Sequence, residues 1–340
     1  MTSEQLDVRI LKGKVVHDVI FESLPACVDV VRDAYLAHAA KETLNPASYF
    51  LRFPEKPSSR IIALPAYLGN RFDVAGLKWI ASFPSNVERG FPRASALLIL
   101  NDYETGYPFA ILESSIISAA RTAASAVLAA EHLVASPKRS RTLGIVGTGL
   151  IARYLYQFFL GTSWQIEHVR VFDKNPAESQ RFTQNVCQTA AHGTVTVAAS
   201  AEELLRECDL VALTTTAPSP YLNDAELLIH RPVVLNVSLR DLGVDLILAS
   251  QNIVDDIDHV LTANTSPHLA EQSVGHRTFI DGTLADVLLG HCRANRERPI
   301  IFSPFGLGVL DLAVGKWIFD TARQREDVIR LADFFFDLSR

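Results

Sequence analysis

The sequence predicts an α/β fold in which a doubly wound parallel sheet follows a mixed α+β region. Three observations support this prediction. After Pro137, short apolar runs alternate with helical segments, as in parallel strands joined by crossover helices. A glycine-rich turn joins the first of these runs to a helix. Before that point, β-rich runs bounded by turn residues follow one another without intervening helices.

The first part of the chain is predicted to be mixed α and β. Apolar residues recur with helical spacing over residues 24–40, and an alanine-rich helix is expected over 114–132. Residues 101–108 have the composition of a hairpin turn in which Gly106 adopts a positive φ. The expected strands are 60–67, 74–82 and 94–101.

The second part is predicted to alternate strands and helices. The basic stretch 138–141 is expected to be a solvated loop, and 308–336 a pair of helices that packs back onto the first part. The expected strands are 143–146, 169–172, 195–198, 210–214, 233–237 and 253–256, and the expected helices are 150–160, 177–191 and 201–207.

Composition and charge exclude several classes of protein. The 340 residues suggest two domains, and 48% hydrophobic with 21% charged residues is ordinary for a globular protein. A formal charge of −6 argues against a nucleic-acid partner. Four cysteines without CxxC pairs or zinc-ligand spacing indicate reduced thiols and no metal site. Without a secretory signal or an apolar run of transmembrane length, we expect a cytoplasmic protein with no membrane partner.

The run Gly147-Thr-Gly-Leu-Ile-Ala152 matches the GxGxxA dinucleotide-binding fingerprint. Gly147 permits the tight turn, Gly149 lets a pyrophosphate approach the helix N-terminus, and Ala152 lets helix and strand pack closely. The parallel sheet is therefore predicted to be of the Rossmann type. Sugar-nucleotide and S-adenosylmethionine enzymes also carry such glycine turns, but the flanking strand, the helix and a later acid favour a nicotinamide dinucleotide.

The acid is Asp173, which follows the next predicted strand. A carboxylate there accepts hydrogen bonds from the ribose of NAD and repels the 2′-phosphate of NADP, although Lys174 leaves room for NADP. Thr214 and Thr215 follow a later strand. They are expected either to line the cofactor cleft or to form a polar turn before Pro218.

Three charged residues are unusual for their context. Lys78 lies in an apolar strand, and Arg121 lies in a helix of small residues, where a guanidinium suits a carboxylate ligand. For both, an exposed or paired structural cation is an equal alternative. Asp241 follows a parallel strand, where α/β active sites open, although a loop aspartate is more often solvated.

Together these motifs resemble the ornithine cyclodeaminase/mu-crystallin family over essentially the whole chain. The resemblance is carried by Gly76-Leu-Lys-Trp79, Leu100-Asn-Asp102, Ser118-Ala-Ala-Arg-Thr-Ala-Ala124, Gly147-Thr-Gly-Leu-Ile-Ala152, Asn236-Val-Ser-Leu-Arg-Asp241 and Gly306-Leu-Gly-Val-Leu-Asp311.

The resemblance implies an NAD-dependent oxidoreductase with two domains. Residues 1–130 and 308–340 would form an α+β domain for substrate binding and homodimer formation, and 131–307 the Rossmann domain. It implies substrate carboxylate contacts from Arg52, Lys78 and Arg121, with Asp241 as the catalytic base and Lys78 as the second candidate. The implied NAD contacts are Gly147, Thr148, Gly149, Leu150, Ile151, Asp173, Thr214, Thr215 and Thr122.

Further motifs are Arg60-Ile-Ile-Ala-Leu-Pro65, Arg93-Ala-Ser95, Leu100-Asn-Asp-Tyr-Glu-Thr-Gly-Tyr-Pro108 and Ser303-Pro-Phe-Gly306. With these, the pattern within the family is most similar to a branch that makes L-2,3-diaminopropionate for siderophores or related metabolites. That branch oxidises N-(2-amino-2-carboxyethyl)-L-glutamate with NAD⁺ and also releases 2-oxoglutarate. Cyclodeaminases usually continue after the aspartate with proline-glycine-lysine, whereas this chain reads Asp241-Leu-Gly-Val-Asp245. The alternatives are an ornithine cyclodeaminase, an imine reductase or amino-acid dehydrogenase, and a non-catalytic NAD-binding protein.

Overall fold

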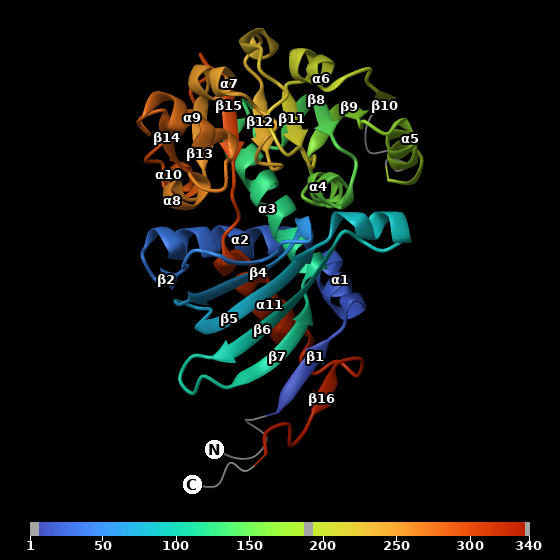
Figure 1. Cartoon of the computed structure of the whole chain (residues 1–340), viewed down its shortest axis with the longest axis vertical. Helices are drawn as coiled ribbons and strands as arrows, with labels where there is room; N and C mark the ends of the chain where they lie inside the picture. The colour runs from blue at the N-terminus through green and yellow to red at the C-terminus, as the bar shows by residue number, and fades with distance from the viewer. Residues whose placement is uncertain (1–6, 187–192, 337–340) are drawn as a thin grey trace. The chain divides into compact units, whose positions relative to one another are not determined.

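The computed structural model describes residues 7–186 and 193–336, and the chain divides into two compact units (Figure 1). Unit 1 comprises Met1–Arg121 and Leu307–Arg340, and unit 2 comprises Thr122–Gly306. Unit 1 is thus discontinuous in sequence. The first division lies within helix α3 (Ser115–Leu133), whereas the sequence-based boundary at residue 130 lies near the end of that helix.

Unit 1 is built on an eight-stranded mixed sheet with the order β16-β1-β7-β6-β5-β4-β2, in which β3 also pairs with β4. The hairpin between β6 and β7 confirms the predicted turn, since Gly106 has a φ of 75°. The strands are β1 Val8–Leu11, β2 Thr43–Leu44, β3 Tyr49–Phe53, β4 Lys56–Leu68, β5 Val74–Ser82, β6 Ala94–Asp102, β7 Pro108–Glu113 and β16 Ile329–Leu331.

One face of this sheet carries helix α11 (Gly308–Ala322), as Figure 1 shows. Glycine is needed at Gly76 because a Cβ there would lie 2.3 Å from the Ile99 carbonyl oxygen and 2.7 Å from a Leu312 methyl group. This close approach lets α11 lie directly on β5. The other helical segments of unit 1 are α1 Gly13–Glu22, α2 Leu24–Ala39 and the short 3₁₀ helix η2 Pro84–Arg89.

The prediction of a helix pair over residues 308–336 was wrong. The helix α11 ends at Ala322, and Ile329–Leu331 forms strand β16, which pairs antiparallel with β1. An ion pair between Arg330 and Asp7 supports this pairing. The partner strand lies at the other end of the chain, so local periodicity carries no sign of it. Residues 337–340 lie outside the described residues.

Unit 2 is an eight-stranded, all-parallel sheet with the order β10-β9-β8-β11-β12-β15-β13-β14. The chain moves outward from β8 through β9 to β10 and then returns to β11 on the other side of β8. This reversal confirms the doubly wound prediction. The strands are β8 Arg139–Val146, β9 Gln165–Phe172, β10 Thr194–Val197, β11 Leu210–Leu213, β12 Val233–Asn236, β13 Gln251–Val254, β14 Ile280–Thr283 and β15 Ile300–Ser303.

The central strands of unit 2 are continuous apolar runs because both faces are covered. All four residues of β11, and likewise of β12, are buried. The stretch 138–141 is not the predicted loop, since β8 begins at Arg139 and pairs there with Gln165 of β9. The helical segments are α4 Leu150–Gly161, α5 Pro176–Asn185, α6 Ala201–Glu207, η3 Ala225–Leu228, α7 Val244–Ala249, α8 Ile257–Val260, α9 Ser266–Val274 and α10 Leu284–Leu288. The end of the helix expected over 177–191 lies outside the described residues.

Candidate active site

The glycine turn after β8 has the geometry that its sequence predicts. Gly147 has a φ of 83°, and a Cβ there would lie 3.0 Å from the backbone of Thr214. A residue with a side chain at position 147 would have an unfavourable positive φ and would crowd the backbone of Thr214. Gly147 also donates its amide to the Phe172 carbonyl oxygen at 2.8 Å, which ties the turn to the end of β9.

Gly149 serves a different purpose, because the space above it is open. It is the N-cap of α4, and a Cβ built on it would meet nothing within 4 Å. Ala152, one turn into the helix, is fully buried. An open backbone at the N-terminus of a twelve-residue helix is suited to a phosphate group, because free amides and the helix dipole favour negative charge there.

A pocket of about 350 Å³ lies at the carboxyl ends of the strands β8, β9 and β11, where the strand order reverses. This is the place where doubly wound sheets bind nucleotides. Its lining residues are Val146, Gly147, Gly149, Phe172, Asp173, Lys174, Thr214, Thr215, Thr216, Ala217, Pro218 and Tyr221. The lining combines apolar walls with hydroxyl groups and one carboxylate, and it fits a dinucleotide.

Asp173 lines the pocket and also holds the glycine turn in place. Its carboxylate accepts hydrogen bonds from the Thr148 amide at 2.8 Å and hydroxyl at 3.1 Å, and from the Asn175 amide at 2.9 Å. Thr214 donates its hydroxyl to the Gly147 carbonyl oxygen at 2.6 Å. The acid and the threonine predicted from sequence are thus joined to the same turn.

The structure brings some predicted cofactor residues into this pocket and leaves others outside it. Gly147, Gly149, Asp173, Thr214 and Thr215 line it. The remaining four do not: Thr148 is buried, Leu150 is exposed, Ile151 is half-buried on α4, and Thr122 is half-buried on α3. For those four, cofactor contact stays a prediction.

Sequence reasoning missed Tyr221. It lines the pocket, and Lys174 lies over its ring with the ammonium 5.7 Å from the ring centroid. Burial raises the pKa of the Tyr221 hydroxyl, and the neighbouring carboxylate of Asp241 raises it further. A tyrosine after Pro218-Ser-Pro carries no recognisable sequence signal, because its role depends on a partner beyond β12.

Asp241 is fully buried rather than solvated. One carboxylate oxygen accepts a hydrogen bond from the Thr215 hydroxyl at 2.5 Å, and the other from the Ser238 hydroxyl. Its backbone carbonyl accepts the amides of Tyr221 and Leu222. Asp241 is not itself in the pocket wall, but Thr215 and Tyr221 are. The carboxylate of Asp241 is therefore connected to the pocket by the hydroxyl groups of Thr215 and Tyr221, which lie beside it.

Unit 1 holds a buried cluster of two cations and one acid. The Lys78 ammonium lies 2.6 Å from the Asp311 carboxylate, and Arg121 Nε lies 3.4 Å from the other oxygen of that carboxylate. Lys78 is 3% and Asp311 0% exposed by side chain. The cluster brings an ammonium and a guanidinium together, and both groups bind carboxylate ligands. The signal for Asp311 was one acid in an apolar helical run, which sequence analysis left without a role.

The charge state of Lys78 is finely balanced. Burial lowers the pKa of its ammonium to about 8, and the charge of Arg121 contributes to the lowering, whereas Asp311 opposes it. Lysines that change charge near neutral pH are common in active sites. Lys78 can therefore serve as a cation below about pH 8 and as a base above it.

Arg52 is not part of this cluster. It is exposed on β3, and its guanidinium lies 5.0 Å from the centroid of the Phe50 ring. Its strand pairs with β4 so that Arg52 lies opposite Arg60. Contact between Arg52 and a substrate carboxylate stays a prediction.

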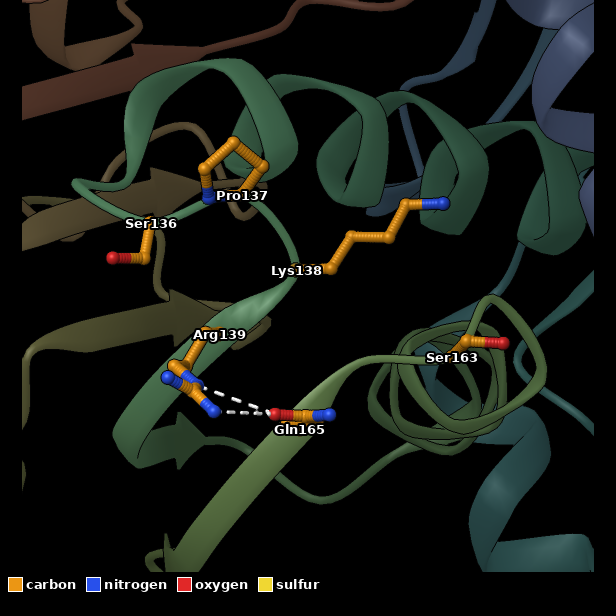
Figure 2. Close-up of a pocket in the computed structure, with 6 residues that line it drawn as sticks. All are labelled: Ser136, Pro137, Lys138, Arg139, Ser163 and Gln165. Atoms are coloured by element: carbon orange, nitrogen blue, oxygen red, sulfur yellow. Dashed lines mark hydrogen bonds between the residues drawn. The ribbon is translucent and has the colours of Figure 1, made fainter.

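A second hollow in unit 2, of about 240 Å³, lies at the amino ends of β8 and β9 (Figure 2). Figure 2 shows that its Arg139 guanidinium is engaged, since it donates to Gln165 Oε1 at 3.2 and 2.9 Å. Doubly wound folds bind nucleotides at the carboxyl ends of their parallel strands, so this hollow at the amino ends is not a candidate cofactor site.

Within residues 7–186 and 193–336, no group of three or more histidine, cysteine or acidic side chains could hold a metal ion. No described helix is long and apolar enough to cross a membrane. Cys27, Cys208 and Cys292 are free thiols, and Cys187 lies outside the described residues.

Comparison with known proteins gives a consistent result. The N-((2S)-2-amino-2-carboxyethyl)-L-glutamate dehydrogenase of Staphylococcus aureus is 30% identical over 308 residues, which cover 88% of this chain and 90% of that protein. The alanine dehydrogenase of Archaeoglobus fulgidus is 28% identical over 324 residues, 93% and 96% of the two chains. A solved archaeal alanine dehydrogenase dimer with bound NAD has a TM-score of 0.84 at 25% identity, covering 97% of this chain and 100% of that one.

These relatives confirm the predictions of an oxidoreductase and of NAD as its cofactor. A model of the ornithine cyclodeaminase/mu-crystallin family matches residues 14–326. The chain therefore belongs to the ornithine cyclodeaminase/mu-crystallin family.

Proposed function

We propose that this protein is a cytoplasmic enzyme that cleaves N-(2-amino-2-carboxyethyl)-L-glutamate oxidatively, in the biosynthesis of siderophores or related metabolites. The substrate is a secondary amine that joins a glutamate half to a diaminopropionate half. With NAD⁺ and water it yields 2-oxoglutarate, L-2,3-diaminopropionate, NADH and a proton. The observation that carries the proposal is the buried cluster of Lys78, Arg121 and Asp311, whose two cations suit an anionic substrate.

In this proposal the cations of unit 1 orient the substrate. Lys78 and Arg121 bind the α-carboxylate of the glutamate half, and Asp311 holds both cations at fixed distances. A guanidinium can hold a carboxylate through two parallel hydrogen bonds, which fixes the neighbouring carbon as well. Because the cluster is buried, its charges act with little screening by water.

The pocket in unit 2 fits the cofactor, which supplies a hydride acceptor for the α-carbon of the glutamate half. Gly149 and the N-terminus of α4 would hold the pyrophosphate, and Asp173 the ribose. Thr215 and Tyr221 line the same pocket. Their place beside Asp241 connects the cofactor pocket to a carboxylate that can accept a proton.

Asp241 is the proposed general base. Through the Thr215 hydroxyl that it holds at 2.5 Å, it takes a proton of the substrate ammonium before oxidation and releases that proton to solvent. It then takes a proton of the attacking water and returns it to the nitrogen of the leaving amine. Water adds to the carbon of the imine formed by oxidation, and the carbon–nitrogen bond then breaks. The amine leaves as diaminopropionate, and the carbonyl carbon stays in 2-oxoglutarate.

A homodimer formed by unit 1 completes the proposal. The face of the sheet opposite α11 carries a cross-strand row of Leu97, Trp79, Ala63 and Tyr49. Leu97 is 50%, Trp79 40% and Tyr49 67% exposed. Neighbouring apolar side chains of this size on an open sheet are typical of a protein interface.

A substrate panel tests the proposed function. Purified protein with NAD⁺ is assayed for NADH formation with the conjugate and L-alanine, and for ammonia release with L-ornithine. With NADH it is assayed for NADH consumption with pyrroline-2-carboxylate. The conjugate should have a kcat/KM at least about a hundredfold above the others, a difference of roughly 2.7 kcal/mol in transition-state binding. Release of ammonia from ornithine, without turnover of the conjugate, would contradict it.

Arg121→Ala separates substrate binding from cofactor binding. We expect KM for the conjugate to rise more than tenfold, because a charge-assisted hydrogen bond contributes roughly 1.5–3 kcal/mol. The NAD⁺ dissociation constant should change less than about twofold, since Arg121 belongs to unit 1. Equal loss of both affinities would give Arg121 a structural role instead.

A further inference from the structure

Three arginines of unit 1 gather at one end of its sheet. Arg52 on β3 lies opposite Arg60 on β4, and Arg60 lies opposite Ser82 on β5. Arg93, which precedes β6, reaches the same place, because its Nη1 donates to the Ser82 hydroxyl at 3.1 Å. We call Arg52, Arg60 and Arg93 the arginine row.

The arginine row has no carboxylate to neutralise it. Among the described residues, no acidic side chain lies within ion-pair distance of any of the three guanidinium groups. Opposed like charges on neighbouring strands destabilise a sheet. Burial of the Arg93 guanidinium and, to a smaller extent, the positive charge of Arg60 lower the pKa of Arg93.

The chain around Arg93 is held in position. The Phe83 amide donates to the Arg93 carbonyl oxygen at 2.8 Å, and this bond closes the connection from β5 to β6. The Phe83 ring lies 5.7 Å from the ring of Phe53 at the end of β3. Three strand ends are thus packed together, and the convergence of the arginines is part of the fold.

The arginine row shares a face of the sheet with Lys78. Side chains alternate along a strand, so Lys78 and Ser82 of β5 project to the same side, and the cross-strand partners Arg60 and Arg52 project there too. Side chains in a strand lean along the strand direction, and lysine and arginine side chains are long. One molecule that bears carboxylates at both ends can therefore engage Lys78 at one end and the arginine row at the other.

We propose that Arg60 and Arg93, together with Arg52, form a second anion subsite that binds the distal carboxylate of the substrate. The proposal rests on the proposed function for the place of the α-carboxylate at Lys78 and Arg121. It makes Arg60 and Arg93 specificity-determining residues. A distal ammonium, as in ornithine, is repelled there, and a short side chain, as in alanine, leaves the guanidinium groups without a ligand.

The test combines two variants with two substrates. In Arg60→Gln and Arg93→Gln, KM for the glutamate conjugate should rise at least tenfold while kcat falls less than threefold. The analogue that carries glutamine in place of glutamate lacks the distal charge, so its KM in the wild type should already be tenfold higher. With that analogue, the substitutions should add less than threefold. Arg60→Lys should recover part of the loss with the natural substrate.

The matched control is Arg323→Gln, which removes an exposed arginine at the end of α11. It should leave both substrates and the thermal midpoint unchanged. Equal KM increases for the conjugate and its glutamine analogue in Arg60→Gln and Arg93→Gln would overturn the proposal. So would unchanged KM values for the conjugate in both variants.

A binding experiment separates this proposal from the reaction itself. Calorimetry with NADH-loaded protein compares 2-oxoglutarate, which has a distal carboxylate, with 2-oxobutyrate, which has none. Wild type should bind 2-oxoglutarate at least tenfold more tightly, and Arg60→Gln should abolish that preference. This result would support the subsite even if the conjugate proves not to be the substrate. Equal affinity of the wild type for 2-oxoglutarate and 2-oxobutyrate would contradict the proposal. So would competition by inorganic phosphate against 2-oxoglutarate that is equally strong in the wild type and in Arg60→Gln.

Discussion

At the residue scale, Lys78 shows how a single charge in an apolar strand acquires a function. Its partner Asp311 is 233 positions away in the sequence. Removing one member of a buried ion pair lowers the free energy of unfolding by roughly 3–5 kcal/mol, because the other charge is left without compensation. The sequence marked Lys78 and Arg121 as unusual cations. It could not show that they share one carboxylate, since that depends on how α11 packs on β5.

Lys78 predicts a specific pH dependence. Burial lowers its pKa to about 8, so the ammonium is charged below that pH and neutral above it. If its charge binds substrate, kcat/KM falls as pH rises through 8, by about tenfold per pH unit. In Lys78→Arg the side chain stays charged, and this falling limb should disappear from the pH profile.

If kcat/KM rises with pH instead of falling, the assignment of the base changes. A limb of kcat/KM that rises through pH 8 and is lost in Lys78→Arg would mean that the neutral amine of Lys78 takes the proton. Asp241 would then be a positioning residue for Thr215. Circular dichroism of each variant checks that the buried pair has not unfolded.

Asp173 predicts cofactor preference. Its carboxylate lines the pocket and repels a 2′-phosphate. In Asp173→Asn the repulsion is lost, while the amide oxygen can still accept the Thr148 amide. The ratio of kcat/KM for NAD⁺ over NADP⁺ should fall about tenfold or more, equivalent to ~1.4 kcal/mol. An unchanged ratio would place the ribose away from Asp173.

At the element scale, the two glycines of the turn have different roles: Gly147 is required by the fold, and Gly149 is expected to be required by the cofactor. Gly147 has a positive φ and backbone within 3.0–3.1 Å of its absent Cβ, so Gly147→Ala should destabilise the protein without cofactor by roughly 1–3 kcal/mol. Thermal unfolding without NAD⁺ measures this.

Gly149→Asp is the matched variant with the opposite signature. Aspartate is a favourable N-cap, and the site has open space, so the unfolding midpoint without cofactor should stay the same or rise. NAD⁺ affinity, measured by fluorescence titration, should fall more than tenfold, because the carboxylate occupies the place of the pyrophosphate and repels it. If Gly149→Asp binds NAD⁺ normally, the pyrophosphate lies elsewhere.

Elements with strong local signals were predicted well. Strand β5 and helix α6 have the predicted bounds, because a nine-residue, mostly apolar run and a serine N-cap are local features. The strand β16 was mistaken for helix, since its pairing with β1 joins the two ends of unit 1. The strand β8 begins earlier than expected because its first pairs with β9 are made by charged and polar residues.

At the scale of the whole molecule, we expect the sheet face that α11 leaves open to form a dimer interface. We expect wild type to elute with twice the mass of one chain in light scattering coupled to size exclusion. Trp79→Glu and Leu97→Glu should shift it to the monomer, since a charge in the core of an interface is costly. Val87→Glu, at an exposed apolar site on η2, should remain dimeric.

A monomeric wild type would remove the role proposed for the row of Leu97, Trp79, Ala63 and Tyr49. Dimers that persist in both Trp79→Glu and Leu97→Glu would place the interface elsewhere. Neither result bears on the cofactor pocket, whose lining residues all belong to unit 2.

The fold class and the cofactor were predictable because their signals are contiguous in sequence: one turn, one acid and a regular alternation of strands and helices. The substrate residues were less predictable, because they converge from segments that are far apart. The burial of Asp241 behind Thr215, the link from Tyr221 to Asp241, and the approach of Arg93 to Ser82 all depend on tertiary packing.

The most direct test uses the conjugate deuterated at the α-carbon of its glutamate half. With NAD⁺, the protein should form deuterated NADH, 2-oxoglutarate and L-2,3-diaminopropionate in equal amounts, measured by mass spectrometry. No reduction of NAD⁺, or deuterium retained in the product, would contradict the claim that this protein oxidises the glutamate half of an amino-acid conjugate.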